Sequence, residues 1–142
     1  EVQRPLALVS GEDAHYISVL SEYIRRGESA TYILDDFLNK EVQSIDLQRA
    51  RLLLGIAYYE QGQHADALAQ LNSIEEKGLY HYECDKANLL RAYLYLQGEQ
   101  TDKPQFDKLL SSRLSRGRVY GQSRLDCMKL ISYGVRVGLM RL

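Results

Sequence analysis

Apolar residues recur at three- and four-residue spacing along most of the chain, which is the pattern of amphipathic helices. Clear examples are the segments ISVLSEYIRRG at 17–27, LLLGIAYYEQG at 52–62 and NLLRAYLYLQG at 88–98. No segment alternates apolar and polar residues for long, and the valines are scattered, so strands are not expected. The pattern therefore predicts an all-α fold.

Start and stop signals divide this pattern into seven expected helices. Their ranges are 12–26, 29–40, 45–61, 64–77, 80–97, 103–113 and 119–139. Ser10 with Asp13 has the spacing of a capping box, and Ser44 stands before the apolar pattern of the third helix. Thr101 or Asp102 can cap the sixth helix, with Pro104 in its first turn.

Three glycines follow these tyrosine- and leucine-rich segments at nearly constant spacing. Gly27, Gly62 and Gly98 are separated by 35 and 36 residues. Each is expected to end a helix in the left-handed conformation, which costs glycine little. A period of this length is typical of helical repeats.

Residues 48–80 carry the most specific motif of the chain. Its key positions are Leu54, Gly55, Tyr58, Gly62, Ala67, Leu71 and Ile74. This pattern resembles a tetratricopeptide repeat, in which two helices cross closely and need small residues at the contact. Gly55 and Ala67 would supply that room, and the larger residues would fill the space between neighbouring hairpins.

The flanking copies of the repeat are weaker. The copy from about 13 to 40 keeps Tyr23 and Gly27, and the copy from about 85 to 115 keeps Tyr95 and Gly98. Because one hairpin cannot bury both its faces, neighbours are expected. The resemblance implies one domain over 1–142, built as a right-handed superhelical stack of antiparallel hairpins. The expected hairpins are 12–40, 45–77 and 80–113, and a C-terminal helix at 119–139 would close the stack.

The resemblance also implies a binding face, because this family usually binds its ligands in the groove lined by the first helix of each hairpin. The residues expected to contact a partner are Arg25, Arg49, Leu52, Ile56, Tyr59, Glu60, Asn88 and Tyr95. Such a lining suits a peptide or an amphipathic helix of another protein. Leu52 and Ile56 replace the Lys and Asn that capture a C-terminal carboxylate in chaperone-binding members, which argues against that role. Tyr59 and Tyr95 have a second interpretation, as core residues packed against a neighbouring helix.

The resemblance therefore predicts a non-catalytic interaction module, such as an adaptor, a scaffold or a small chaperone. The chain contains no phosphate-binding glycine loop, no G-x-S-x-G and no H-E-x-x-H motif. His81 and Cys84 share a helix face, but two ligands do not make a zinc site. No catalytic residue, metal, cofactor or small-molecule substrate is expected.

The net charge of −1 hides an uneven distribution. Residues 1–112 carry 11 Lys and Arg against 18 Asp and Glu, whereas residues 113–142 carry seven against one. The arginine-rich segment 111–124 supports an alternative function, binding to nucleic acid phosphates or to an acidic surface. The same segment can instead lie against the acidic part of this chain, and the C-terminal helix can contact a further domain or a second copy.

Little in the sequence specifies the compartment. No apolar run approaches the roughly 20 residues of a membrane span, so a soluble chain is expected. Because the chain opens on Glu1, both a cytoplasmic protein and one exported after signal removal stay open. Cys84 and Cys127 are expected to be buried thiols rather than a disulfide framework.

Overall fold

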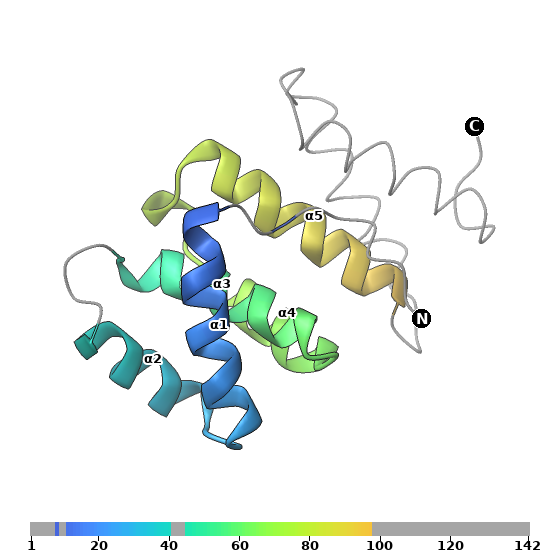
Figure 1. The fold of residues 1–142 in the computed structure, drawn as a ribbon. Helices are drawn as coiled ribbons and strands as arrows, with labels where there is room; N and C mark the ends of the chain where they lie inside the picture. Colours follow the sequence, from blue (N-terminus) through green and yellow to red (C-terminus); the bar gives the residue numbers. More distant parts are fainter. Residues whose placement is uncertain (1–7, 9–10, 41–44, 98–142) are drawn as a thin grey trace, which may run out of the picture. The chain divides into compact units, whose positions relative to one another are not determined.

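The structure is a computed structural model that describes residue 8 and residues 11–40 and 45–97. Within these residues the chain is helical and contains no strand (Figure 1), which confirms the all-α prediction for this part. The elements are α1 (Gly11–Arg25), α2 (Ala30–Lys40), α3 (Leu47–Glu60), α4 (His64–Asn72), the short 3-10 helix η1 (Glu76–Gly78) and α5 (His81–Gln97). The expected helices at 103–113 and 119–139 lie outside the described residues, so the seven-helix superhelical stack stays a prediction.

The five described α-helices begin and end within two residues of their predicted bounds, with one exception. Helix α4 ends at Asn72 rather than near 77. Beyond it, the carbonyl of Ser73 accepts a hydrogen bond from Nη1 of Arg51 at 3.0 Å, and Oε1 of Gln48 accepts one from the N–H of Glu75 at 2.8 Å. These side chains of α3 bind backbone groups that a longer α4 would have used, so the chain leaves the helix and turns through η1.

Two helix starts show how the caps form. Oγ of Ser29 accepts a hydrogen bond from the N–H of Tyr32 at 3.2 Å at the start of α2. At the start of α3, Oδ1 of Asp46 accepts one from the N–H of Arg49 at 2.9 Å. Asp46, two residues after the Ser44 noted in the sequence, therefore supplies the cap of α3. The predicted cap at Ser10 lies outside the described residues.

The first two glycine turns have the same construction. Gly27 has φ +79° and Gly62 has φ +78°, as predicted for left-handed helix ends, whereas Gly98 lies outside the described residues. The N–H of Gly62 donates to the carbonyl of Tyr59, and the next N–H donates to that of Tyr58. The equivalent pair of bonds forms around Gly27, 35 residues earlier. Both ends are Schellman motifs, which satisfy carbonyls that the helix leaves without a partner.

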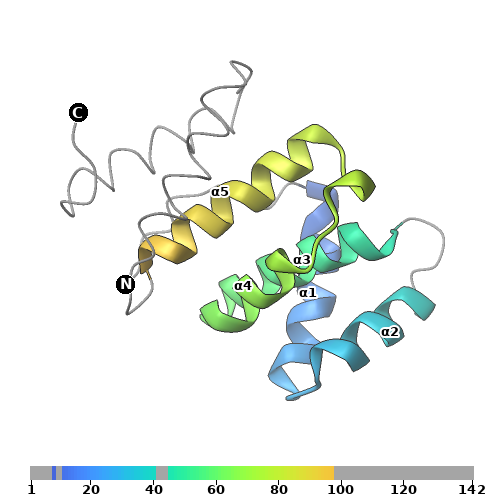
Figure 2. The same cartoon turned by 180° about the vertical axis from the view of Figure 1, so that it is seen from behind.

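The chain forms two compact units. One unit, Leu8–Cys84, contains α1 to α4 and the first turn of α5, whereas residues 1–7 and 85–142 belong to the other. In the first unit α3 is the central helix, which contacts α1, α2 and α4 (Figures 1 and 2). The prediction of one domain over the whole chain stays a prediction.

The first unit has an aliphatic and aromatic core. Its most deeply buried large side chains include Leu20, Ile33, Phe37, Leu53, Leu54 and Leu71. Where α3 and α4 cross, a Cβ at position 55 would lie 2.9 Å from Cδ2 of Leu71 and 3.6 Å from the carbonyl oxygen of Ala67. The expectation that Gly55 makes room for the crossing is thus confirmed, and Ala67 is fully buried at the same crossing. No helix in the described ranges is long and apolar enough to cross a membrane.

Candidate functional site

The apolar residues of the predicted groove lie on one face of α3 and are buried. Leu52, Ile56 and Tyr59 are 2%, 1% and 6% exposed. The ring of Tyr59 also stacks on His64 of α4, with 5.9 Å between the ring centres. This burial fits the core interpretation of Tyr59, and the groove assignment of these residues stays a prediction.

The polar residues of the predicted face differ in their surroundings. Arg25 is exposed and forms an ion pair with Glu22 at 3.1 Å, and Glu60 is half-buried. Arg25 and Glu60 occupy equivalent positions, 35 residues apart, at the ends of α1 and α3. In the other unit, Asn88 is buried and its Oδ1 accepts a hydrogen bond from Arg91 at 3.4 Å. Tyr95 belongs to α5, but its side chain lies outside the described part of the structure.

Arg49 joins three helices through two carboxylates. Its Nη2 lies 2.7 Å from Oδ1 of Asp13 in α1, and its Nε lies 3.5 Å from Oε2 of Glu83 in the first turn of α5. The side chains of Arg49, Asp13 and Glu83 are 22%, 13% and 7% exposed, so solvent and salt screen these ion pairs only partly. Arg49, predicted to contact a partner, therefore also holds α1, α3 and the start of α5 together.

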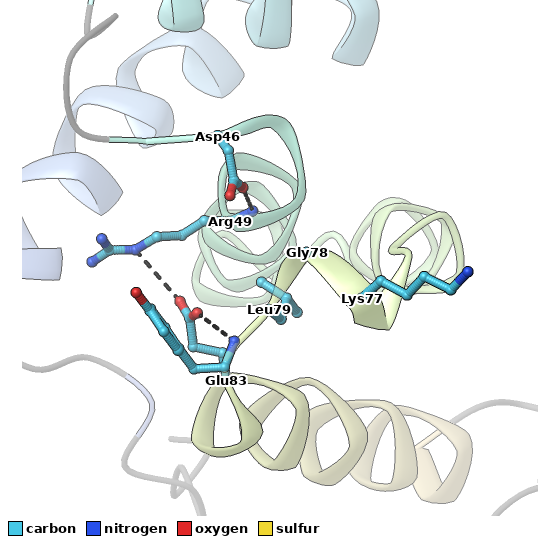
Figure 3. A pocket seen from close by; sticks show the side chains of 7 residues that line it. Asp46, Arg49, Lys77, Gly78, Leu79 and Glu83 are labelled. Atoms are coloured by element: carbon cyan, nitrogen blue, oxygen red, sulfur yellow. Dashed lines mark hydrogen bonds and ion pairs between the residues drawn. The ribbon is translucent and has the colours of Figure 1, made fainter.

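A pocket of about 510 Å³ opens beside this ion-pair group (Figure 3). Its lining comes from the start of α3, from η1, from the connection between η1 and α5, and from the first turn of α5. The residues are Asp46, Arg49, Lys77, Gly78, Leu79, Tyr80 and Glu83. Oε1 of Glu83 accepts a hydrogen bond from the N–H of Tyr80 at 3.1 Å. Figure 3 shows the Lys77 side chain pointing away from the other lining residues. Tyr80 is 72% exposed.

The sequence interpretation missed Asp46, Tyr80 and Glu83 as a group. The contact between Tyr80 and Glu83 could have been predicted, because Glu83 stands three residues after Tyr80 at a predicted helix start. A glutamate there reaches back to the first backbone N–H, as in the second half of a capping box. No local signal links this turn to Arg49, which is 34 residues earlier.

A second polar cluster connects α1 and α2. The hydroxyl of Tyr23 donates to Oδ2 of Asp36, and Nζ of Lys40 lies 2.9 Å from the same oxygen. The hydrogen bond from Tyr23, and after it the one from Lys40, holds the pKa of Asp36 below its usual value. Burial, followed by the hydrogen bond to Asp36, raises the pKa of Tyr23. The cluster therefore links α1 to α2 through the carboxylate of Asp36.

The cysteine and histidine residues in the described ranges form no metal-ligand group. No group of three or more His, Cys, Asp or Glu side chains there could hold a metal ion. Cys84 is buried, and Cys127 lies outside the described residues.

Comparisons of this chain with protein-family models, with curated proteins and with solved structures find no match. Function is therefore inferred from the chain's own residues.

Proposed function

We propose that this chain is a non-catalytic protein–protein interaction module, an adaptor, scaffold or small chaperone that binds a peptide or an amphipathic helix of a partner. The observation that supports it most is the repetition of one helical turn. Tyr23 with Gly27 and Tyr58 with Gly62 take part in equivalent Schellman motifs at 35-residue spacing. Stacked helical repeats present extended surfaces that suit other proteins rather than small substrates.

The proposed binding face follows the first helices of the hairpins. Arg25 and Glu60 contribute opposite charges at equivalent places of α1 and α3, and both have solvent access. Charges at the rim of an interface set its orientation and its rate of association more than its affinity. Leu52, Ile56 and Tyr59 are the apolar residues predicted for this face on α3, although they are 2%, 1% and 6% exposed. Tyr95 is the aromatic residue predicted for it on α5.

Site-specific photo-crosslinking tests this face with little risk to the fold. A photoreactive amino acid is placed at position 25 or 60, and the matched controls carry it at Asn39 of α2 or Asn72 of α4, two exposed residues on second helices. We expect the first pair to capture a specific protein from the source cell and the controls to capture none. Equal capture at all four positions would contradict the proposed face.

Once that protein is identified, the aromatic residues can be tested directly. Truncating an interface aromatic typically costs about 2 kcal/mol or more of binding free energy. We expect Tyr59→Ala with Tyr95→Ala to abolish binding while the helical circular dichroism is kept. Loss of the circular dichroism signal would instead assign both residues to the core. A folded variant that binds as well as the wild type would remove them from the binding face.

Salt dependence separates this function from binding by the arginine-rich segment 111–124. Phosphate contacts weaken steeply between about 50 and about 200 mM salt, whereas apolar contacts weaken little. We expect capture to survive the higher salt. A loss of several hundredfold, together with binding to nucleic acid, would favour the basic segment as the site.

A further inference from the structure

We infer that the pocket beside η1 receives a basic side chain, Arg or Lys, from a partner protein. The inference rests on the proposed function, since it assumes that the chain binds proteins. The pocket volume of about 510 Å³ lies within the range of roughly 300–1,000 Å³ that ligand sites occupy. The pocket is a different surface from the predicted binding face, because Arg49 is the one residue that belongs to both.

Two carboxylates of the pocket retain the capacity to accept more hydrogen bonds. Asp46 uses Oδ1 to cap α3. Glu83 accepts the N–H of Tyr80 through Oε1, and its Oε2 lies 3.5 Å from Nε of Arg49. A carboxylate offers about four acceptor positions, so each of the two can bind a further donor. The Glu83 side chain is only 7% exposed, which makes a charge-assisted bond to it stronger than one in water.

The cations nearby do not neutralise this pocket. Arg49 divides its guanidinium between Asp13 and Glu83, and Lys77 extends away from the other lining residues (Figure 3). Residues 8–84 carry 13 Asp and Glu against six Lys and Arg. The electrostatic potential around this unit therefore favours the approach of a positively charged group.

Tyr80 adds an aromatic wall suited to the same ligand. Its ring is largely exposed, and a guanidinium or ammonium over such a ring is attracted by the negative face of its π-system. Its backbone is held, because its N–H donates to Glu83 and its carbonyl accepts from the N–H groups of Glu83 and Cys84, each at 3.0 Å. The segment before it is fixed to Gln48 and Arg51 of α3. A recognition residue on a pre-organised backbone loses little entropy on binding.

The test uses two small probes on the full chain. Uniformly ¹⁵N-labelled protein is titrated with N-acetyl-arginine amide, and in parallel with N-acetyl-citrulline amide, which has nearly the same shape without the charge. We expect saturable shifts of the backbone signals of residues 46–49 and 77–83 with the arginine probe only. Equal shifts with both probes, or shifts spread over the whole unit, would overturn the inference.

Matched variants identify the groups responsible. Asp46→Asn removes the charge and keeps a good helix cap, so the fold is preserved. We expect Asp46→Asn and Tyr80→Ala each to lower the affinity for the arginine probe at least about fivefold. Asp66→Asn removes one exposed charge of the same unit outside the pocket lining and should change the affinity less than about twofold. Unchanged affinity in Asp46→Asn would reject the site.

The outcome also separates this inference from the proposed function. If positions 25 and 60 capture a partner but the arginine probe causes no saturable shift, the pocket assignment fails and the interaction module stands. If the probe binds as described but those positions capture nothing specific, the pocket stands and the proposed binding face fails.

Discussion

Gly55 of α3 lies directly against Leu71 of α4, and no side chain fits between them. A Cβ at position 55 would stand 2.9 Å from Cδ2 and 3.1 Å from Cγ of Leu71. The missing side chain lets the two helices cross closely enough to bury Leu71 and Ala67. The only glycine inside α3 therefore has a packing role that outweighs its poor helix propensity.

Enlarging either small residue at this crossing should destabilise the first unit. We expect Gly55→Leu and Ala67→Leu each to lower the free energy of unfolding by about 1–3 kcal/mol, because the added atoms have no space. Urea unfolding followed by circular dichroism measures the loss. Ala65→Leu, at an exposed position of α4, is the matched control and should leave the free energy of unfolding nearly unchanged. If both core variants unfold like the control, the crossing is not as described.

The left-handed turn at Gly62 should tolerate asparagine better than alanine. With φ at +78°, an alanine Cβ approaches the carbonyl that follows it, which costs about 1–2 kcal/mol. Asparagine visits this conformation more easily, so Gly62→Asn should cost clearly less than Gly62→Ala. Thermal unfolding of the two variants decides the point, and the same order is expected at Gly27. Equal midpoints for Ala and Asn would mean that the turn relaxes.

Replacing Arg49 alone should lower the free energy of unfolding more than replacing Arg49 and Glu83 together. Arg49→Met leaves the buried Glu83 carboxylate without its ion pair, which we expect to cost about 1–3 kcal/mol. Glu83→Gln in the same chain removes the stranded charge and keeps an acceptor for the N–H of Tyr80. The double variant should therefore recover part of the loss, as a double-mutant cycle in urea will show. Strict additivity would indicate that Arg49 and Glu83 do not interact.

The alkaline stability of the chain should depend on Tyr58. Burial, followed by the negative charge of Asp66, raises the pKa of this phenol. The folded chain thus binds the phenolic proton more tightly than the unfolded chain does. The resulting stabilisation is complete below the unfolded pKa of about 10 and is lost as the pH rises through the folded pKa.

Tyr58→Phe removes the group that titrates. We expect its free energy of unfolding to fall less than that of the wild type between about pH 9 and about pH 11. Urea unfolding at both pH values gives the comparison. Tyr32→Phe, at a residue that is 48% exposed, serves as the control and should follow the wild type. Parallel losses in all three proteins would show that ionisation of Tyr58 does not limit stability.

Much of the local structure was predictable, because it depends on neighbours a few residues apart. The 3.6-residue apolar period gave the five described helices, and glycine's freedom at positive φ marked the ends at Gly27 and Gly62. The contact of Gly55 with α4 could also be predicted, since the resemblance required a small residue on each helix of the hairpin. These features need only the chain's own periodicity and the backbone conformations that each residue type permits.

The features that involve distant residues were decided by the tertiary structure. Arg51 and Gln48 ended α4 early by binding backbone groups 22 and 27 residues further along the chain. The sequence alone identified Arg49 as a polar residue of a binding face, but its position between Asp13 and Glu83 follows from the packing of three helices. Leu52, Ile56 and Tyr59 have the pattern of an apolar helix face, and periodicity is the same for a face that meets a partner and for one that is buried within the chain. Only the folded arrangement distinguishes the two, because burial depends on which other segments come to lie against that face.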